Sequence, residues 1–239
     1  TGTYNLVSSN RTFTVPTTTT IFTTDPGRNF SIHNAVMSGL SLDAEYSYVV
    51  GNPSCGYSSP RTFRTQRTSY PQYHVLLGDM GAAFAYSLCK ECSSEETCVC
   101  APNATAGIIS EIDTADMILH VGDFAYDLNS NNGTTGDRFF SNIENVTSRV
   151  PYMISHGNHE DADDSLSRFT ESWRHMPANN GTVTSINGEA PNNWFFSWDA
   201  GLVHYISIST EIQGGTSIVI LFFTHTHTNK QTIISQAQC

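Results

Sequence analysis

Three stretches of similar design decide the fold: YHVLLGD at residues 73–79, DMILHVGD at 116–123 and VPYMISHGNHE at 150–160. Each contains an apolar run that ends on glycine followed by aspartate or asparagine. Continuous apolar runs are typical of strands buried on both faces of a sheet, and the gaps between them leave room for crossover helices. The pattern therefore predicts an α/β domain.

The segments around these runs support the same architecture. AGIISEID at 106–113 and GDRFFSNIENVTSRV at 136–150 have spacing compatible with helices. Further along, NWFFSWDAGLVHYISIST at 193–210 predicts two strands that turn at Ala200 and Gly201.

The first part of the chain has a different hydrophobic pattern. TFTV at 12–15, AEYSYVVG at 44–51 and PRTFRT at 60–65 are short alternating stretches separated by glycine, aspartate and proline. This pattern predicts an antiparallel β-sandwich over residues 1–67. A polar connector ending at Pro71 marks a domain boundary, so the second domain is expected over residues 72–212.

Composition excludes two classes of partner. The net charge is −11 with only 11 Lys and Arg among 239 residues, and the basic residues are scattered. Nucleic-acid binding needs basic patches, so no nucleic-acid partner is expected. The longest apolar run, at 218–223, is far too short to cross a bilayer, so no membrane span is expected.

Four of the six cysteines lie in CKECSSEETCVC at 89–100. Zinc ligands and disulfides are both compatible with this cluster, but its second pair, C-x-C, is tight for a tetrahedral site. We therefore favour a surface loop closed by disulfides, whose pairing the spacing does not define. N-glycosylation sequons point weakly to a secreted, lysosomal or vacuolar protein. They begin at Asn10, Asn29, Asn103, Asn132, Asn145 and Asn180.

The three apolar runs carry the candidate chemistry at their ends. Asp79, Asp123 and Asn158 each follow a glycine at the point where a predicted strand stops. Ligands bind open α/β sheets at the carboxyl ends of the strands, so these oxygen-bearing side chains are expected to converge on one edge. Each motif alone has a plainer interpretation as a turn or a helix cap. Their ordered combination favours a functional site.

The residue types suit a pair of hard metal ions. Asp123 can bridge two ions because its carboxylate has two oxygens, and Asp79 can serve one of them. A phenolate from Tyr126 would favour a trivalent ion such as iron(III), while Asn158 would supply a neutral oxygen to the second ion. His159 could hold substrate or donate a proton. Such a centre polarises a phosphate ester and generates a hydroxide nucleophile.

At these motifs the sequence resembles a known family. GDMG at 78–81, GDFAYD at 122–127 and GNHE at 157–160 are similar to the first three motif blocks of the purple acid phosphatases, within the calcineurin-like metallophosphoesterases. The resemblance covers residues 10–212. It implies an α/β metallophosphoesterase fold, an αββα sandwich of which the first half is present. A partial fibronectin type III-like β-sandwich would precede it.

The resemblance also implies site roles. Asp79, Asp123 and Tyr126 would hold Fe(III), and Asp123 and Asn158 would hold a divalent Fe, Zn or Mn ion. His159 would contact the phosphate. The implied activity is hydrolysis of small phosphomonoesters at acid pH by a metal-bound hydroxide, and a homodimer is compatible with the family.

Two other functions stay open. The chain could be a non-catalytic truncated product that acts as an interaction module, or a metallophosphodiesterase. Tyr126 argues against the phosphodiesterase, because the phenolate ligand is typical of the purple enzymes.

The family's later histidine blocks, V-x-x-H and G-H-x-H, are not found. His204 is expected in the core of a strand, and His175 matches neither block. The pattern weakens over 213–239, which is predicted to lie outside the family. His225 and His227 follow an apolar run in that tail without the family's preceding glycine, so we do not expect them to be ligands. Without these histidines, activity of the chain is in doubt.

Overall fold

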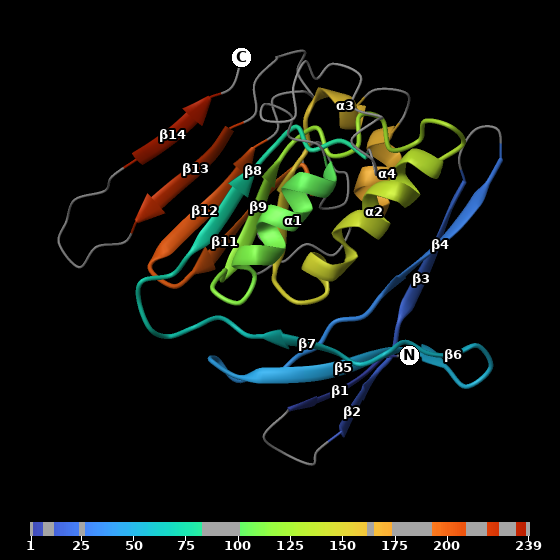
Figure 1. Cartoon of the computed structure of the whole chain (residues 1–239), viewed down its shortest axis with the longest axis horizontal. Coiled ribbons are helices and arrows are strands. Elements are labelled where there is room, and N and C mark those ends of the chain that lie inside the picture. The colour runs from blue at the N-terminus through green and yellow to red at the C-terminus, as the bar shows by residue number, and fades with distance from the viewer. Residues whose placement is uncertain are drawn as a thin grey trace.

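The computed structural model describes residues 2–6, 12–23, 27–82, 101–161, 165–173, 193–208, 219–224 and 233–237. An N-terminal group of strands lies on one side of an α/β domain (Figure 1). The four cysteines of the 89–100 loop lie outside the described residues, as do His175, His225 and His227. Cys55 is described, and it is an exposed free thiol.

The N-terminal domain is an antiparallel β-sandwich, as predicted. One sheet has the order β2-β1-β5-β6, with β7 also paired to β5, and β3 pairs with β4 in the other. The strands are β1 (Gly2–Leu6), β2 (Thr12–Val15), β3 (Thr18–Thr23), β4 (Asn29–Asn34), β5 (Glu45–Asn52), β6 (Gly56–Tyr57) and β7 (Arg61–Arg64). Threonine and aromatic residues alternate along these strands, which suits a pleated surface with one face toward water.

A parallel sheet of order β10-β9-β8 forms the centre of the second domain. Its strands are β8 (His74–Leu77), β9 (Met117–Val121) and β10 (Tyr152–Ser155). Leu77 pairs with His120, and Val121 pairs with Ser155, so the carboxyl ends of all three strands lie at one edge. β10 is buried along its whole length, as predicted. That prediction is wrong for β8, where Leu76 is 44% exposed. Its side chain points away from the helix-side core that Val75 and Leu77 contact, and it is not among the described residues that pack between the two sheets.

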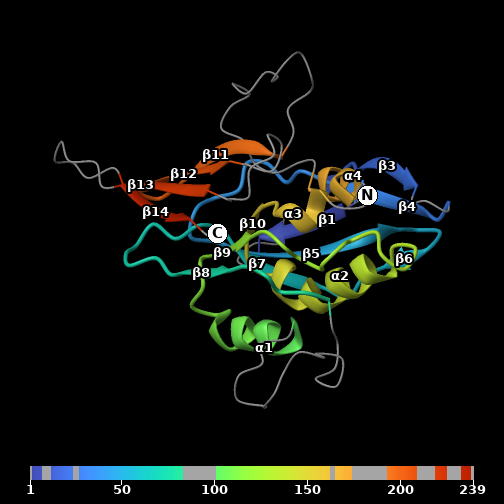
Figure 2. The ribbon, with the colours of Figure 1, turned by 90° about the horizontal axis from the view of Figure 1, so that it is seen from above.

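Two long helices cover one face of this sheet (Figure 2). They are α1 (Ala101–Glu111) and α2 (Thr134–Thr147); two shorter helices are α3 (Asn158–Asp161) and α4 (Ser165–Ser172). Phe139, Ile143 and Val146 are buried at helical spacing on α2 and pack with Ile118 of β9. The apolar stripe of α2 thus fixes its position against the sheet.

A second sheet covers the other face (Figure 2). It is antiparallel, with the order β11 (Phe195–Ala200), β12 (Val203–Ile208), β13 (Val219–Thr224) and β14 (Ile233–Ala237). The turn lies at Gly201, with φ 62°, where it was predicted. Met117, Leu119 and Met153 pack against Trp198 and Tyr205 between the two sheets.

His204 does not lie in the core, contrary to the prediction. Side chains alternate along a strand, and the buried residues of β12 are Tyr205 and Ser207. The His204 ring is 26% exposed and its Nδ1 lies 2.6 Å from Oδ1 of Asp199. Among the described residues, no helix is long and apolar enough to cross a bilayer.

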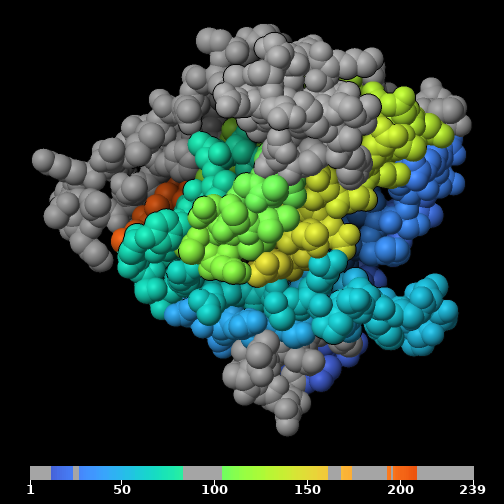
Figure 3. All heavy atoms as spheres, in the orientation of Figure 1, coloured from blue at the N-terminus to red at the C-terminus, as the bar shows by residue number. Residues whose placement is uncertain are grey.

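Polar contacts join the two domains. Arg61 forms an ion pair of 2.6 Å with Glu144 of α2, and the Tyr48 hydroxyl donates to the carbonyl oxygen of Ser148 over 3.0 Å. In Figure 3 the blue and cyan atoms of the N-terminal domain lie directly against the green and yellow atoms of the second domain. The N-terminal domain is thus anchored along α2, the helix that follows the second strand-end motif.

Candidate functional site

The turns that follow β8, β9 and β10 are hydrogen-bonded to one another. The amide of Asp79 donates to the carbonyl of Gly122 over 3.2 Å, and the amide of Met80 donates to the carbonyl of Asp123 over 3.1 Å. The amide of Gly122 in turn donates to the carbonyl of Ser155 over 2.9 Å. The parallel register therefore carries on past the strands and brings the three motifs together at one edge.

The turns require glycine where backbone and side chain approach closely. A Cβ on Gly157 would lie 2.3 Å from Oδ1 of Asp123, and one on Gly78 would lie 2.7 Å from the carbonyl oxygen of Val121. Asp79 and Asp123 both adopt a left-handed backbone conformation with φ 53°. Such conformations are strained for residues with a side chain and recur at functional sites.

Asp79 and Tyr126 meet directly. The Tyr126 hydroxyl donates to Oδ1 of Asp79 over 2.8 Å, although they are 47 residues apart. Burial raises the pKa of Tyr126 well above its usual value, and its bond to Asp79 and the charge of that carboxylate add to the effect. The phenol therefore keeps its proton unless a cation replaces it.

Asp123 lies between the other two motifs. Its Oδ1 accepts a hydrogen bond from the amide of His159 over 3.3 Å. Burial raises the pKa of the Asp123 carboxyl, while the His159 amide opposes that shift. Asn158 stands between Gly157 and His159 as the first residue of α3, and its side chain is exposed. The turns that carry Asp79, Asp123 and Asn158 thus lie side by side, and the use of the three side chains as ligands stays a prediction.

His159 is held by a residue that the sequence analysis missed. Its Nδ1 lies 3.0 Å from Oδ1 of Asp127, and its ring packs on Tyr126 at 4.5 Å between centroids. Partial burial acts to lower the pKa of His159, but the bond to Asp127 and the charge of Asp123 outweigh it and raise the pKa. Asp127 directly follows the tyrosine in GDFAYD, so its position in that motif was the available signal.

Glu160 is the second residue that was missed. Its side chain is fully buried, and its two oxygens accept hydrogen bonds from the amides of Asp123, Phe124 and Gly157 over 2.8, 2.9 and 2.8 Å. Burial raises its pKa to about 7, against the opposing effect of these amides. Glu160 therefore binds the second and third turns together. A charged residue closing GNHE directly after a buried strand was the signal for it.

The side chains at this edge provide some of the ligands that one hard cation would need. Among the residues the structure describes, no three His, Cys, Asp or Glu side chains gather as a metal-binding group. The oxygens of Asp79 and Tyr126 are 2.8 Å apart, however, close enough to share an ion in place of the phenol proton. Carboxylate and phenol oxygens are ligands for hard cations. The chemistry of this donor pair therefore suits a hard cation, and the identity of the metal stays a prediction.

Family models match both domains. Residues 2–65 match the N-terminal domain of purple acid phosphatases, and residues 75–232 match the calcineurin-like phosphoesterases. The chain belongs to the purple acid phosphatases. The predicted domain limits at 67, 72 and 212 stay predictions.

Relatives of the chain include acid phosphatase type 7 from Homo sapiens, which is 41% identical over 189 residues and covers 77% of the chain. Acid phosphatase type 7 from Danio rerio is 32% identical over 183 residues and covers 76% of the chain. The chain spans 36% and 35% of these two relatives. Purple acid phosphatase PPD1 from yellow lupin seeds has a similar fold, with a TM-score of 0.59 and 20% identity over 84% of this chain and 38% of that one.

Proposed function

We propose that the chain hydrolyses phosphomonoesters at acid pH through the edge formed by its three strand-end motifs. The observation that carries the proposal is the direct contact of Asp79 with Tyr126 beside the contact of Asp123 with His159. Two carboxylates, a phenol and an imidazole lie in neighbouring turns at one edge of the sheet. Packing requirements alone do not account for that combination.

We propose that this edge binds two cations. Asp79, Asp123 and Tyr126 would hold Fe(III), and Asp123 with Asn158 would hold a divalent Fe, Zn or Mn ion. Bound there, the ions would polarise the phosphate ester and lower the pKa of a coordinated water.

The chain's own residues supply positioning and proton transfer. Since Nδ1 of His159 bonds to Asp127, we assign Nε2 to the oxygen of the leaving alcohol. The raised pKa of His159 favours the protonated ring at acid pH, so this residue can donate a proton to that oxygen. Glu160 keeps the turns that carry Asp123 and His159 in register.

Iron loading followed by visible spectroscopy and an assay with p-nitrophenyl phosphate tests this function. We expect an absorption band in the visible region that Tyr126→Phe removes, and hydrolysis at acid pH that His159→Ala reduces by about a hundredfold or more. Tyr57→Phe is the matched control because Tyr57 is exposed on β6 of the other domain. An iron-supplied chain with neither band nor hydrolysis would overturn the proposal.

A second candidate is a non-catalytic member of the family. Two observations favour it: the described residues contain no complete metal-binding group, and some relatives carry names such as "Probable inactive purple acid phosphatase 9" from Arabidopsis thaliana, which is 27% identical over 230 residues. The same assay separates the two candidates. A chain that shows the visible band but hydrolyses nothing would be a metal-binding protein without turnover.

A further inference from the structure

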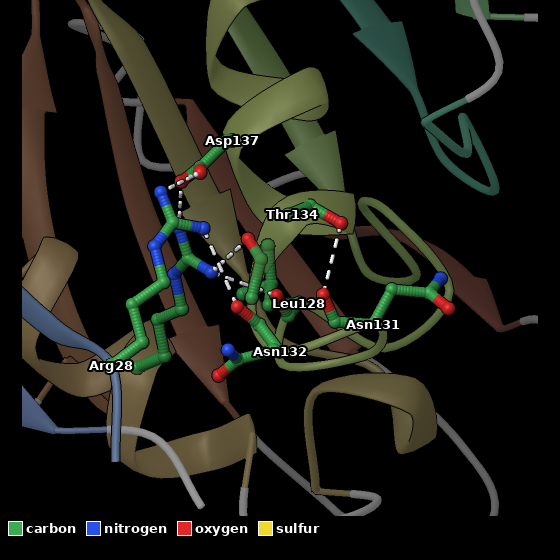
Figure 4. A network of polar contacts seen from close by, with 8 residues as sticks. Arg28, Leu128, Asn131, Asn132, Thr134 and Asp137 are labelled. Atoms are coloured by element: carbon green, nitrogen blue, oxygen red, sulfur yellow. Dashed lines mark hydrogen bonds and ion pairs between the residues drawn. The ribbon is translucent and has the colours of Figure 1, made fainter. Parts of the chain in front are cut away.

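Two arginines from distant parts of the chain meet at Asp137, near the start of α2. Nη2 of Arg28 lies 2.6 Å from one carboxylate oxygen, and Nη2 of Arg168 lies 2.8 Å from the other. Figure 4 shows Arg28 reaching from the N-terminal domain toward Asp137. The Phe30 ring lies 4.4 Å from the Arg28 guanidinium and 4.3 Å from that of Arg168, measured from the ring centroid. Charge pairing and cation–π contact therefore act in the same cluster.

The same arginines hold the segment 127–133, which joins the GDFAYD motif to α2. Nη1 of Arg168 donates to the carbonyl oxygens of Leu128 and Gly133 over 2.9 and 2.6 Å. Nη1 of Arg28 donates to the carbonyl oxygen of Asn132 over 3.3 Å (Figure 4). The side chain of Arg168 is buried, with 4% exposed, so its N–H groups form hydrogen bonds with this segment and with Asp137 rather than with water.

Two glycines show how closely this cluster is packed. A Cβ on Gly133 would lie 2.7 Å from Cζ of Phe30 and 2.8 Å from Nη1 of Arg168. One on Gly136 would lie 2.7 Å from Cζ of Arg168. Gly133 also has φ 78°, a conformation that favours glycine. The segment thus has little room to shift while Phe30 and Arg168 are in place.

The held segment begins at the residue that orients His159. Leu128, whose carbonyl Arg168 holds, directly follows Asp127. The backbone of Asp127 is itself part of the segment, because its carbonyl oxygen accepts the amide of Ser130 over 3.0 Å. Asp127 is left-handed, with φ 75°, and its carboxylate bonds to His159. A left-handed aspartate keeps this conformation only when its surroundings enforce it.

We propose that Arg28 is a positioning residue for His159, acting through the 127–133 segment. The N-terminal domain is then part of the support of the site rather than an independent module. Arg28 and Phe30 complete the cluster around Arg168, and the cluster fixes the segment that places Asp127. The role of Arg28 in catalysis rests on the proposed function of His159, whereas the coupling between the two domains does not.

Amide hydrogen exchange of the full chain, without metal or substrate, tests the coupling. We expect Arg28→Gln to speed exchange in the 127–133 segment by about threefold, the effect of losing a partly exposed ion pair. Arg61→Gln is the matched control, because the Arg61–Glu144 pair also joins the domains at 2.6 Å but does not contact this segment. Arg28 is 39% exposed, so its substitution leaves the core of either domain in place.

The orientation of His159 is read separately by ¹⁵N NMR of its imidazole ring. We expect Arg28→Gln to lower the fraction of the tautomer that carries its proton on Nδ1, and Arg28→Lys to restore part of it by returning the charge. Arg61→Gln should leave the tautomer unchanged. Equal effects of Arg28→Gln and Arg61→Gln, or no effect of either, would overturn the proposal.

The hydrolysis assay then separates this inference from the proposed function. If the wild-type chain is active, Arg28→Gln should lower kcat about threefold with little change in KM, and an unchanged kcat would refute the positioning role. If the wild-type chain hydrolyses nothing, the proposed function fails. A difference between Arg28→Gln and Arg61→Gln in exchange and tautomer would still support the coupling.

Discussion

The two domains of this chain are stabilised in different ways. Within the described residues 12–65, Tyr46 is the single side chain that is fully buried, and Phe63 stacks on it at 5.6 Å between ring centroids. The α/β domain instead buries whole strands between two helices and a second sheet. The N-terminal sandwich therefore depends more on polar contacts with its neighbour, such as those of Arg28 and Arg61, than on its own core.

This difference shows which parts of the molecule hold the site residues in position. The strand ends that carry Asp79 and Asp123 are fixed by the sheet itself. The segment behind Asp127 is fixed from outside, by side chains of the weaker domain. Substitutions in the two domains should therefore have separable effects on stability and on the site.

The largest contrast is expected between two phenylalanines. Phe124 is 0% exposed, while Phe63 is half-buried. Phe124→Ala should lower the free energy of unfolding by about 3–5 kcal/mol because it leaves a cavity among aromatic rings. Phe63→Ala should cost about half as much. Urea denaturation of both variants measures the difference, and equal losses would contradict the contrast between the domains.

Gly157→Ala is expected to have the next largest effect. Its Cβ would lie 2.3 Å from Oδ1 of Asp123, so the turn or the carboxylate must move, at a cost of about 3 kcal/mol. Gly107→Ala is the matched control, because Gly107 lies on α1 with nothing within 4 Å of its Cβ position. There alanine should stabilise the chain by about 0.5–1 kcal/mol. Thermal unfolding of the two variants should shift in opposite directions.

Acid should weaken the α/β core through His120. This ring is 0% exposed, and burial lowers its pKa from 6.5 to about 3. As the pH falls, the unfolded chain therefore protonates His120 at a higher pH than the folded chain does. The contribution of neutral His120 to stability is present in full above pH 6.5 and is lost as the pH drops toward 3. Between pH 6.5 and 5 the loss should be about 2 kcal/mol. His120→Gln should flatten this part of the curve in denaturation series, and an unchanged slope would exclude His120 as its source.

The smallest effect is expected at the exposed interdomain pair. Arg61→Gln should cost about 0.2–1 kcal/mol, because Glu144 is 61% exposed and solvent screens the interaction. The loss should shrink further at high salt. Denaturation at low and high ionic strength measures it, and a loss well above this range would mean that Arg61 has a structural role beyond its ion pair.

Local pattern was sufficient for much of the fold. The apolar runs predicted β9 and β10, and the turn lies at Gly201 as predicted. A helix was also predicted at α2, where Phe139, Ile143 and Val146 are buried at helical spacing. Pattern alone could not show that Leu76 of β8 stays exposed or that His204 turns away from the core. Exposure depends on which segments pack nearby, and that is not encoded in neighbouring residues.

For the site, the sequence by itself determined which oxygen donors stand at strand ends, since a glycine followed by Asp79 or Asp123 directly after an apolar run is a local signal. Only the tertiary structure decided their partners: Tyr126 for Asp79, Asp127 for His159, and Arg28 for Asp137 across the domain boundary. A hydrogen bond depends on distance and direction in space. Residues far apart in the chain, such as Arg28 and Asp137, acquire both only when the two domains pack together.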